Sequence, residues 1–343
     1  MNPKWHDFLA NHGAHLEGGQ VRDFGNAKAA LDAAASGAVM APLTQFGLIR
    51  AAGEDAATFL HNLLTNDVRN LNRARAARCG FCTPKGRLLA DFLLWREEQD
   101  YLLQLSADIA PALSKKLGMY VLRSKVKLTS ADDDTVLLGL AGETAGVALK
   151  AAGLDAPAAV MEVAPCDGGA LIRVGERRFQ AALRVDAAIR LWEHLAASAM
   201  PVGAPVWRWL DIAAGIPHIT ALTQEEFVPQ AVNLDLIGGI SFTKGCYPGQ
   251  EIVARTKYLG KIKRRAYRVH IEGDTPLPGA DLIGADLPGQ SCGKIIEAAP
   301  SQAGGCEALV SMLAASAQPG NVRLGAADGP PLSFLPLPYE LIE

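Results

Sequence analysis

Residues 242–255 read FTKGCYPGQEIVAR, and this stretch decides how the rest of the chain is interpreted. Gly245 permits a backbone geometry that other residues resist. The run 247–250 (YPGQ) fits a type II turn, with proline at its second position and glycine at its third. The pattern that follows predicts a helix over 251–259 that buries three apolar side chains, Ile252, Val253 and Leu259. Cys246 should therefore lie in the loop directly before a helix.

Cys246 is a candidate functional thiol because of its surroundings in the sequence. Lys244 is a cationic neighbour, and a helix N-terminus follows; both favour the thiolate, which is the nucleophilic and metal-binding form of cysteine. The acid Glu251 opposes this effect. The alternative is a buried structural cysteine, the commoner state of a cysteine between apolar strands. The residues alone leave both interpretations open.

Positive charge gathers around the same stretch. Residues 244–268 carry eight Lys or Arg and one acid, a local charge of +7. Since the net charge of the chain is −3, the remainder carries −10. A solvated basic face and a site for an anionic partner are both compatible with this pattern. The net charge itself gives no reason to expect bulk attraction to nucleic acid or to an anionic membrane.

Composition bounds the class of protein. A chain of 343 residues, 49% hydrophobic and 20% charged, can bury a large core and suggests two or three packed domains. The N-terminus lacks the apolar stretch of a signal peptide, and no run is long enough for a membrane span. The six cysteines are scattered, which predicts reduced thiols rather than a disulfide framework. We therefore expect a cytoplasmic protein.

The sequence pattern of the chain changes near Ile262. Helical and strand-like segments are mixed over 1–258, whereas short apolar runs separated by Gly, Pro and Asp turns follow. That second pattern is typical of a small antiparallel β-domain. We therefore predict an α+β fold with an α+β region over 1–258, a linker near 259–263 and a β-domain over 259–343.

Two further segments contain polar residues in strand-like runs. Residues 78–83 and 87–94 predict two strands joined at the turn 84–86, and Asp91 lies inside the second apolar run. Because unpaired burial of a carboxylate is costly, Asp91 should bind a ligand's N–H groups or cap a neighbouring loop. Residues 120–127 alternate like the start of a strand, with Arg123 on its charged side, which is also compatible with a solvated edge.

Cys79 and Cys82 have the spacing of a redox or zinc pair. A structural zinc site usually needs a second pair, which this sequence lacks, so a structural role is the better interpretation. Gly-rich phosphate loops and a nucleophile-elbow serine are also absent.

Together these segments resemble the YgfZ family of folate-binding proteins, which support iron–sulfur enzymes and, in bacteria, iron–sulfur-dependent tRNA modification. The stretch 242–255 is the most specific match. Weaker matches follow in the same order along the chain: Gly53–Ala56, Phe59-Leu60, Thr65–Val68, Pro84–Asp91, Tyr120–Val126, Ala214–Pro217, Phe227–Gln230 and Asn233-Leu234.

The implied architecture is similar to that of the glycine-cleavage T-protein, an aminomethyltransferase. In that family, three domains surround a central opening that holds tetrahydrofolate, and the last domain is a β-barrel. The resemblance thus implies two interlaced subdomains within 1–258 and a C-terminal antiparallel β-barrel.

The chain departs from the T-protein where that enzyme's chemistry lies. A pair of adjacent aspartates there corresponds to Ala90-Asp91 here, and the segment 211–215 lacks an expected arginine. The segment 175–180 matches only loosely. Since aminomethyl transfer needs a placed acid or base, we expect folate binding to survive these changes better than transfer does.

The resemblance implies a role for each candidate residue. Cys246 and Lys244 are the expected catalytic residues, with Cys246 ligating metal transiently or exchanging with a partner's thiol or persulfide. The expected supporting residues of the motif are Gly245, Tyr247, Gly249, Gln250, Glu251 and Arg255. The expected contacts to tetrahydrofolate or a derivative are Asp91, Tyr120, Arg123 and Asn233.

The leading hypothesis is a folate-binding accessory factor for assembly, repair or maintenance of iron–sulfur enzymes, including tRNA-modifying ones. Its expected partners are folate and iron–sulfur client or assembly proteins, without direct nucleic-acid binding and without a membrane. One alternative is a tetrahydrofolate-dependent one-carbon transferase of the T-protein type. The other is a structural interaction protein with a vestigial pocket.

Overall fold

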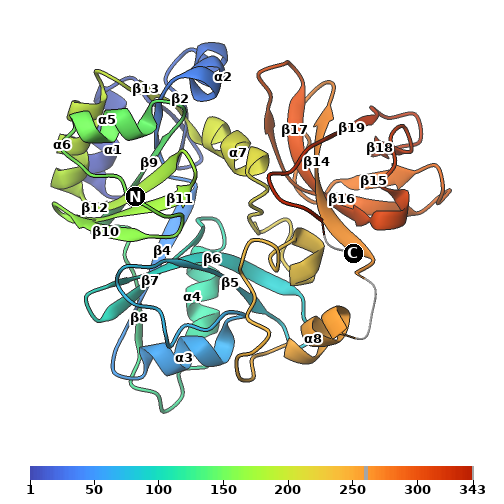
Figure 1. The fold of residues 1–343 in the computed structure, drawn as a ribbon, viewed down its shortest axis with the longest axis horizontal. Helices are drawn as coiled ribbons and strands as arrows, with labels where there is room; N and C mark the ends of the chain where they lie inside the picture. The colour runs from blue at the N-terminus through green and yellow to red at the C-terminus, as the bar shows by residue number, and fades with distance from the viewer. Residues whose placement is uncertain (259–261, 342–343) are drawn as a thin grey trace. The chain divides into compact units, whose positions relative to one another are not determined.

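The structure, a computed structural model, describes residues 1–258 and 262–341 (Figure 1). The chain forms two compact units. Unit 1 comprises residues 1–57, 70–77 and 93–207, and unit 2 comprises 58–69, 78–92 and the chain from 208 onward. The expected linker lies partly at 259–261, outside the described residues, and the predicted boundary between 258 and 259 stays a prediction.

Unit 1 contains most of the helices that the N-terminal half of the sequence predicts. Its elements, including those that continue into unit 2, are α1 Pro3–Asn11, β1 His15–Glu17, β2 Gln20–Asp23, α2 Ala27–Ser36, β3 Val39–Pro42, β4 Phe46–Ala52, α3 Ala56–Leu63, β6 Leu88–Glu97, β7 Asp100–Ser106, α4 Ala110–Gly118, β8 Lys127–Ser130, β9 Thr135–Ala141, α5 Ala145–Ala151, β10 Val163–Cys166, β11 Gly169–Gly175, β12 Arg178–Arg184, α6 Val185–Leu195, β13 Met200–Pro201 and α7 Ala204–Ala213.

A six-stranded sheet of order β10-β11-β12-β9-β3-β13 forms the centre of unit 1. Helices α1, α5 and α6 lie against it (Figure 1). Helix α6 is amphipathic: Ala188, Leu191, Trp192 and Leu195 are buried, and its charged residues lie on the other face. Trp192 meets Trp5 of α1 edge to face, with ring centroids 5.8 Å apart. This apolar packing forms the core of unit 1.

The segment after α4 corrects one prediction. Residues 120–124 form turns rather than the start of a strand, because the backbone continues the end of α4: Tyr120 N donates to Leu117 O at 3.0 Å and Ser124 N to Val121 O at 2.7 Å. Leu122 has a positive φ of 46° and is 89% exposed. Strand β8 begins only at Lys127.

Unit 2 contains the cysteine stretch and the C-terminal β-domain. Its further elements are β5 Ala77–Cys82, η1 Pro229–Val232, α8 Gln250–Tyr258, β14 Arg264–Ile271, β15 Asp281–Gly284, β16 Ser291–Pro300, β17 Cys306–Leu313, η2 Ala314–Ser316, β18 Val322–Leu324 and β19 Leu332–Leu335.

The last six strands form one antiparallel sheet of order β18-β15-β16-β17-β14-β19 (Figure 1). This confirms the β-domain predicted from the change in sequence pattern near Ile262. Side chains alternate between its two faces. One face packs in a cluster with Val269, Val310 and Met312, and the other faces the segments 212–253 through Ala266 and Leu309.

The predicted hairpin over 78–94 is also confirmed. Strands β5 and β6 are neighbours in a sheet, and the turn between them closes with a hydrogen bond from Gly86 N to Thr83 O at 2.9 Å. Gly86 has a φ of 70°, the left-handed conformation that glycine adopts easily. Among the described residues, no helix has the length and apolar character needed to cross a membrane.

Candidate functional site

Cys246 lies in an exposed loop directly before α8, as predicted. The turn that follows it has the expected geometry: Gln250 N donates to Tyr247 O at 3.1 Å, and Gly249 has a φ of 80°. Of the six cysteines, Cys246 is the exposed one; Cys166 is half-buried and the remaining four are buried. The thiol is therefore available to solvent and to a partner.

Gly249 packs directly on the backbone of the β5–β6 turn. A Cβ at position 249 would lie 2.5 Å from Thr83 O and 2.6 Å from the Cα of Gly86. Both neighbours are backbone atoms, which cannot move aside as a flexible side chain can. The contact therefore fixes the turn of the cysteine loop against the hairpin.

Lys244 is 6% exposed, and its ammonium group points to the end of α3. Its Nζ donates to Leu64 O at 2.6 Å and also to His61 O. Such a cation satisfies carbonyl groups that have no partner within the helix. It also lies 4.7 Å from the ring centroid of Tyr247. Burial lowers the pKa of Lys244 to about 8.

These contacts assign Lys244 a definite structural task, which is to anchor the cysteine loop. Its expected role in activating the Cys246 thiol stays a prediction. His61 lies in the same place: its Nδ1 is 3.0 Å from Asp67 Oδ1, and a Cβ built on Gly245 would be 3.7 Å from its Nε2. Burial and the charge of Lys244 lower the pKa of His61.

The segment Thr65-Asn66 holds the chain that leads into the cysteine loop. Thr65 Oγ1 donates to Gly239 O at 2.6 Å and accepts from Gly80 N at 2.7 Å. Asn66 Nδ2 donates to Gly238 O and to Arg78 O, both at 2.8 Å. These bonds explain why a Thr-Asn pair far earlier in the sequence belongs to the same site.

Helix α8 presents the other motif residues. Val253 is fully buried and its carbonyl accepts from Gln230 Nε2 at 2.6 Å. Ile252 is 37% exposed, so the prediction that it is buried was wrong; its side chain rests on Gly86 at the rim of the hairpin. Leu259 lies outside the described residues.

The polar residues of the motif are close to the loop. Gln250 Nε2 donates to Lys244 O at 3.4 Å. Glu251 is in the first turn of α8 and Arg255 in its last turn, where each complements the helix dipole. Tyr247 is buried, which raises its pKa. Tyr247 and Gln250 therefore both contact Lys244 within the loop of the exposed thiol.

Cys79 and Cys82 lie in β5 and are buried, as their structural interpretation requires. Burial raises the pKa of both thiols, that of Cys82 to about 12. Within residues 1–258 and 262–341, no group of three or more His, Cys, Asp or Glu side chains is arranged to hold a metal ion.

Asp91 belongs to a second, buried group of titratable residues in unit 2. Its Oδ1 accepts from Ile219 N at 2.6 Å, and its Oδ2 lies 3.1 Å from His218 Nδ1. His218 Nε2 lies 3.3 Å from Asp211 Oδ2. Burial opposes the charge on the His218 imidazole, but the carboxylates of Asp91 and Asp211 outweigh it and raise its pKa to about 10. His218 and Asp211 were not recognised as candidates in the sequence.

Glu297 of β16 adds a third carboxyl group to this cluster. It is 3% exposed, and among the described residues its Oε1 has no hydrogen-bond partner. Burial raises its pKa to about 8, so at neutral pH the carboxyl group is mainly protonated. A neutral carboxyl group beside a charged imidazole and two carboxylates offers hydrogen-bond donors and acceptors in a buried site.

The remaining expected folate contacts are divided between the two units. Asn233 is buried, with Nδ2 donating to Ala266 O at 2.8 Å and Oδ1 accepting from Ala266 N at 3.1 Å. It thereby ties the segment after η1 to β14. Tyr120 and Arg123 are exposed residues of the turns in unit 1. A joint contact of these residues with folate stays a prediction.

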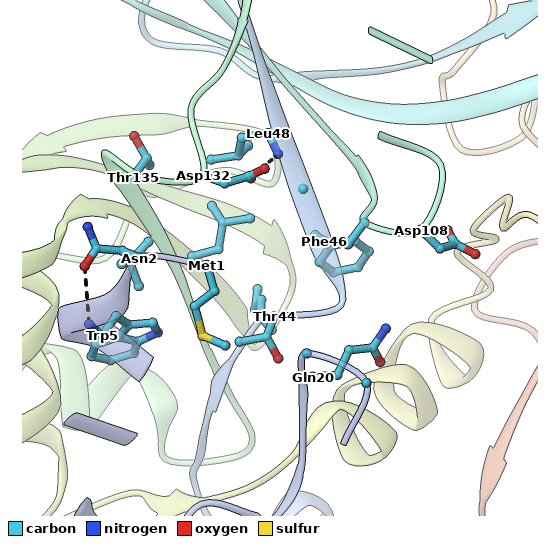
Figure 2. A pocket seen from close by; sticks show the side chains of 17 residues that line it. Met1, Asn2, Trp5, Gln20, Thr44, Phe46, Leu48, Asp108, Asp132 and Thr135 are labelled. Carbon is cyan, nitrogen blue, oxygen red and sulfur yellow. Dashed lines mark hydrogen bonds between the residues drawn. The ribbon is translucent and has the colours of Figure 1, made fainter. Parts of the chain in front are cut away.

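Unit 1 contains a pocket of about 330 Å³ that the sequence did not reveal (Figure 2). Figure 2 shows Asp132 directed at Leu48, whose backbone N donates to Oδ1 at 2.7 Å. The other oxygen of Asp132 accepts from Ser130 Oγ at 2.9 Å. Both oxygens of this carboxylate therefore accept hydrogen bonds from neighbouring residues of unit 1.

Comparison with known proteins adds three findings. A family model described as the GCVT N-terminal domain matches residues 21–237, which end before the cysteine stretch. The tRNA-modifying protein YgfZ of Klebsiella pneumoniae (strain 342) is 34% identical over 244 residues, 70% of this chain and 74% of the relative. The YgfZ protein of Enterobacter sp. (strain 638) is also 34% identical, over 245 residues.

The fold is similar to that of the glycine cleavage system aminomethyltransferase T from Bartonella henselae. The TM-score is 0.80 over 97% of this chain and 95% of that structure. The sequence identity is 19%, so this likeness concerns the fold alone. It confirms the T-protein-like α+β fold expected from the sequence.

Proposed function

We propose that this chain supports tRNA modification, because it belongs to the family of the tRNA-modifying protein YgfZ and contains a GCVT N-terminal domain. More specifically, we propose a folate-binding accessory factor for assembly, repair or maintenance of iron–sulfur enzymes, tRNA-modifying ones included. It would act in the cytoplasm through Cys246. Its partners would be iron–sulfur client or assembly proteins.

The observation that carries this proposal is the exposed thiol of Cys246 on a loop held from three sides. Lys244 anchors the loop to the carbonyls after α3, Gly249 packs on the β5–β6 turn, and Gln230 holds α8. A buried structural cysteine would not need these three anchoring contacts, because packing alone would hold its side chain. A fixed, accessible thiol suits either transient metal ligation or exchange with a partner's thiol or persulfide.

Folate is proposed to use the buried cluster around Asp91. The side chains fit the chemistry of a pterin, whose amino and ring N–H groups seek carboxyl oxygens. The Oε1 atom of Glu297 is a buried polar atom that has no partner among the described residues. A bound folate would supply one-carbon or redox chemistry of its own.

The T-protein type of transfer is less well supported. Both oxygens of Asp91 are already engaged, one by Ile219 N and one by His218. These contacts occupy the carboxylate with its own neighbours, whereas aminomethyl transfer needs an acid or base placed at the substrate. The site therefore favours binding of folate over aminomethyl transfer.

The proposal is tested in cells that lack their own member of the family, by the activity of an iron–sulfur enzyme. Wild-type protein should restore the activity, and Cys246→Ala should not. Cys166→Ala, which removes a half-buried thiol from unit 1, is the matched control and should restore it fully. Full rescue by Cys246→Ala would exclude the thiol mechanism.

A separate titration of the purified protein with tetrahydrofolate tests the cofactor. Saturable binding that weakens in Glu297→Gln or Asp91→Asn is expected, and the absence of any binding signal would remove folate from the account. Turnover with a methylamine donor that is lost in Asp91→Asn but kept in Cys246→Ala would instead identify a transferase.

A further inference from the structure

A pocket of about 340 Å³ in unit 2 shares no lining residue with the two groups described above. Its wall combines three cations, Arg87, Arg264 and Lys294, with one acid, Glu226, and with apolar residues of the segment 227–231. The cations come from three separate parts of the chain: the residue before β6, the start of β14 and the middle of β16. The fold therefore gathers this charge in one place, whereas the sequence does not.

The backbone fixes the positions of the charged groups. Leu88 N donates to Phe227 O at 2.8 Å, which brings Arg87 beside Glu226, and Arg87 Nη1 donates to Glu226 O at 2.5 Å. Arg264 Nη1 donates to Cys292 O at 2.8 Å. Both guanidinium groups are thus held by neutral carbonyl groups.

The positive charge of the pocket is only partly compensated. Lys294 Nζ lies 3.3 Å from Glu226 Oε2 and 3.9 Å from Asp281 Oδ1. In the part of the chain that the structure describes, neither Arg87 nor Arg264 has a carboxylate partner. The lining thus leaves an excess of positive charge, which attracts an anion.

Ser311 is the strongest sign that the pocket receives a ligand. It is 1% exposed and lines the pocket, yet its Oγ has no hydrogen-bond partner within residues 1–258 and 262–341. In the sheet, Ser311 of β17 is paired with Lys294 of β16 and with Ala266 of β14. Directly paired residues share a face, so the hydroxyl group and the Lys294 side chain project to the same side.

A buried hydroxyl group without a partner is costly in a folded protein. An oxyanion would remove that cost, since it accepts a hydrogen bond from the hydroxyl while the cations offset its charge. The apolar side of the pocket, with Phe227, Val228 and Ala231, would then contact a non-polar part of the same molecule.

We propose that this pocket is a binding site for a small molecule that carries a phosphate or carboxylate group on an apolar body. The oxyanion contacts Lys294, Arg264 and Ser311, and the apolar body lies against Val228. None of its lining residues belongs to the Cys246 motif or to the proposed folate contacts. Arg264, which belongs to the basic stretch 244–268, would thereby contribute to binding an anion.

The test measures binding to the full chain by isothermal titration calorimetry at low salt. The three probes are phenyl phosphate, benzoate and inorganic phosphate. Phenyl phosphate or benzoate should bind saturably and several-fold more tightly than inorganic phosphate. The better of the two identifies the preferred oxyanion. Lys294→Gln and Arg264→Met should each weaken that binding by about tenfold, and Ser311→Ala by about threefold.

Lys263→Met is the matched control, because Lys263 is an exposed cation beside Arg264 that does not line the pocket. It should change the affinity by less than about twofold. Each variant is checked by thermal unfolding; Ser311→Ala keeps every charge and serves if a charge variant fails to fold.

Three results would overturn the proposal. One is the absence of saturable binding of both aromatic probes up to about 10 mM. Another is an equal loss of affinity in Lys263→Met, which would indicate attraction to general surface charge. The third is equal affinity for inorganic phosphate and for the aromatic probes, which would exclude the apolar contact.

Discussion

At the scale of single residues, the site depends on side chains whose partners lie far away in the sequence. Lys244 reaches the carbonyls of His61 and Leu64, and His218 pairs with Asp91. The first contact stabilises the loop of the exposed thiol. The second holds the carboxylate of Asp91 inside unit 2. These two pairings are the basis on which we propose an accessory factor rather than a transferase.

Lys244→Met should destabilise the protein by about 2 kcal/mol, because it leaves two backbone carbonyls without their charged donor. Urea unfolding followed by circular dichroism measures this change. Lys263→Met, which removes an exposed cation of unit 2, should change the free energy of unfolding by less than about 0.5 kcal/mol. Equal stability of the two variants would contradict the anchoring role of Lys244.

Glu297 predicts a pH dependence of stability. Its pKa is raised from 4.5 to about 8 in the folded protein, so between these values the folded state holds a proton that the unfolded state has released. The free energy of unfolding should therefore fall as pH rises from about 4.5 to 8, by at most about 1.4 kcal/mol per pH unit from this group.

Glu297→Gln lacks the titrating carboxyl group and should lose this part of the slope. The measurement is the difference in unfolding free energy between wild type and variant, taken by urea titration at several pH values. The difference should change steadily between pH 5 and 8 in favour of the variant. A difference that is constant over that range would show that Glu297 titrates normally.

At the scale of elements, the cysteine loop is positioned by its close contact with the β5–β6 hairpin. Gly249→Ala should destabilise the protein by about 2–4 kcal/mol, since the new Cβ meets backbone atoms and the residue keeps a positive φ. Thermal unfolding and rescue of enzyme activity in cells both measure the effect.

Gly320→Ala is the matched control for this change. Gly320 also has a positive φ, 77°, but a Cβ there would meet nothing within 4 Å. It should therefore show only the conformational cost, about 1 kcal/mol. If both variants lose the same stability, the contact between Gly249 and the hairpin is not important.

The elements were also what the sequence predicted best. The turn 247–250, the hairpin of β5 and β6 and the C-terminal β-domain follow from local patterns of Pro, Gly and apolar residues. The turns at 120–124 and the exposure of Ile252 were predicted wrongly, because neighbouring elements decide them. His218, Asp211 and Glu297 were missed, since nothing local in the sequence marks side chains that meet only in the fold.

At the scale of the whole molecule, the fold and the family both match the expectation from the sequence. The chain has the T-protein-like fold and the relationship to YgfZ that the cysteine stretch implied. The GCVT match ends at residue 237, so the exposed thiol lies beyond the part of the chain that this domain model covers. Glu297 of the proposed folate cluster also lies beyond residue 237, so both proposed sites use residues outside that domain model.

The most direct test of the central claim is the fraction of tRNA that carries an iron–sulfur-dependent modification. It is measured by mass spectrometry of nucleosides from cells that lack their own family member and express this protein at matched levels. Wild type and Cys166→Ala should restore the modified nucleoside. Cys246→Ala should leave its amount at the level found in cells that express no family member. Restoration by Cys246→Ala equal to that by wild type would contradict the account.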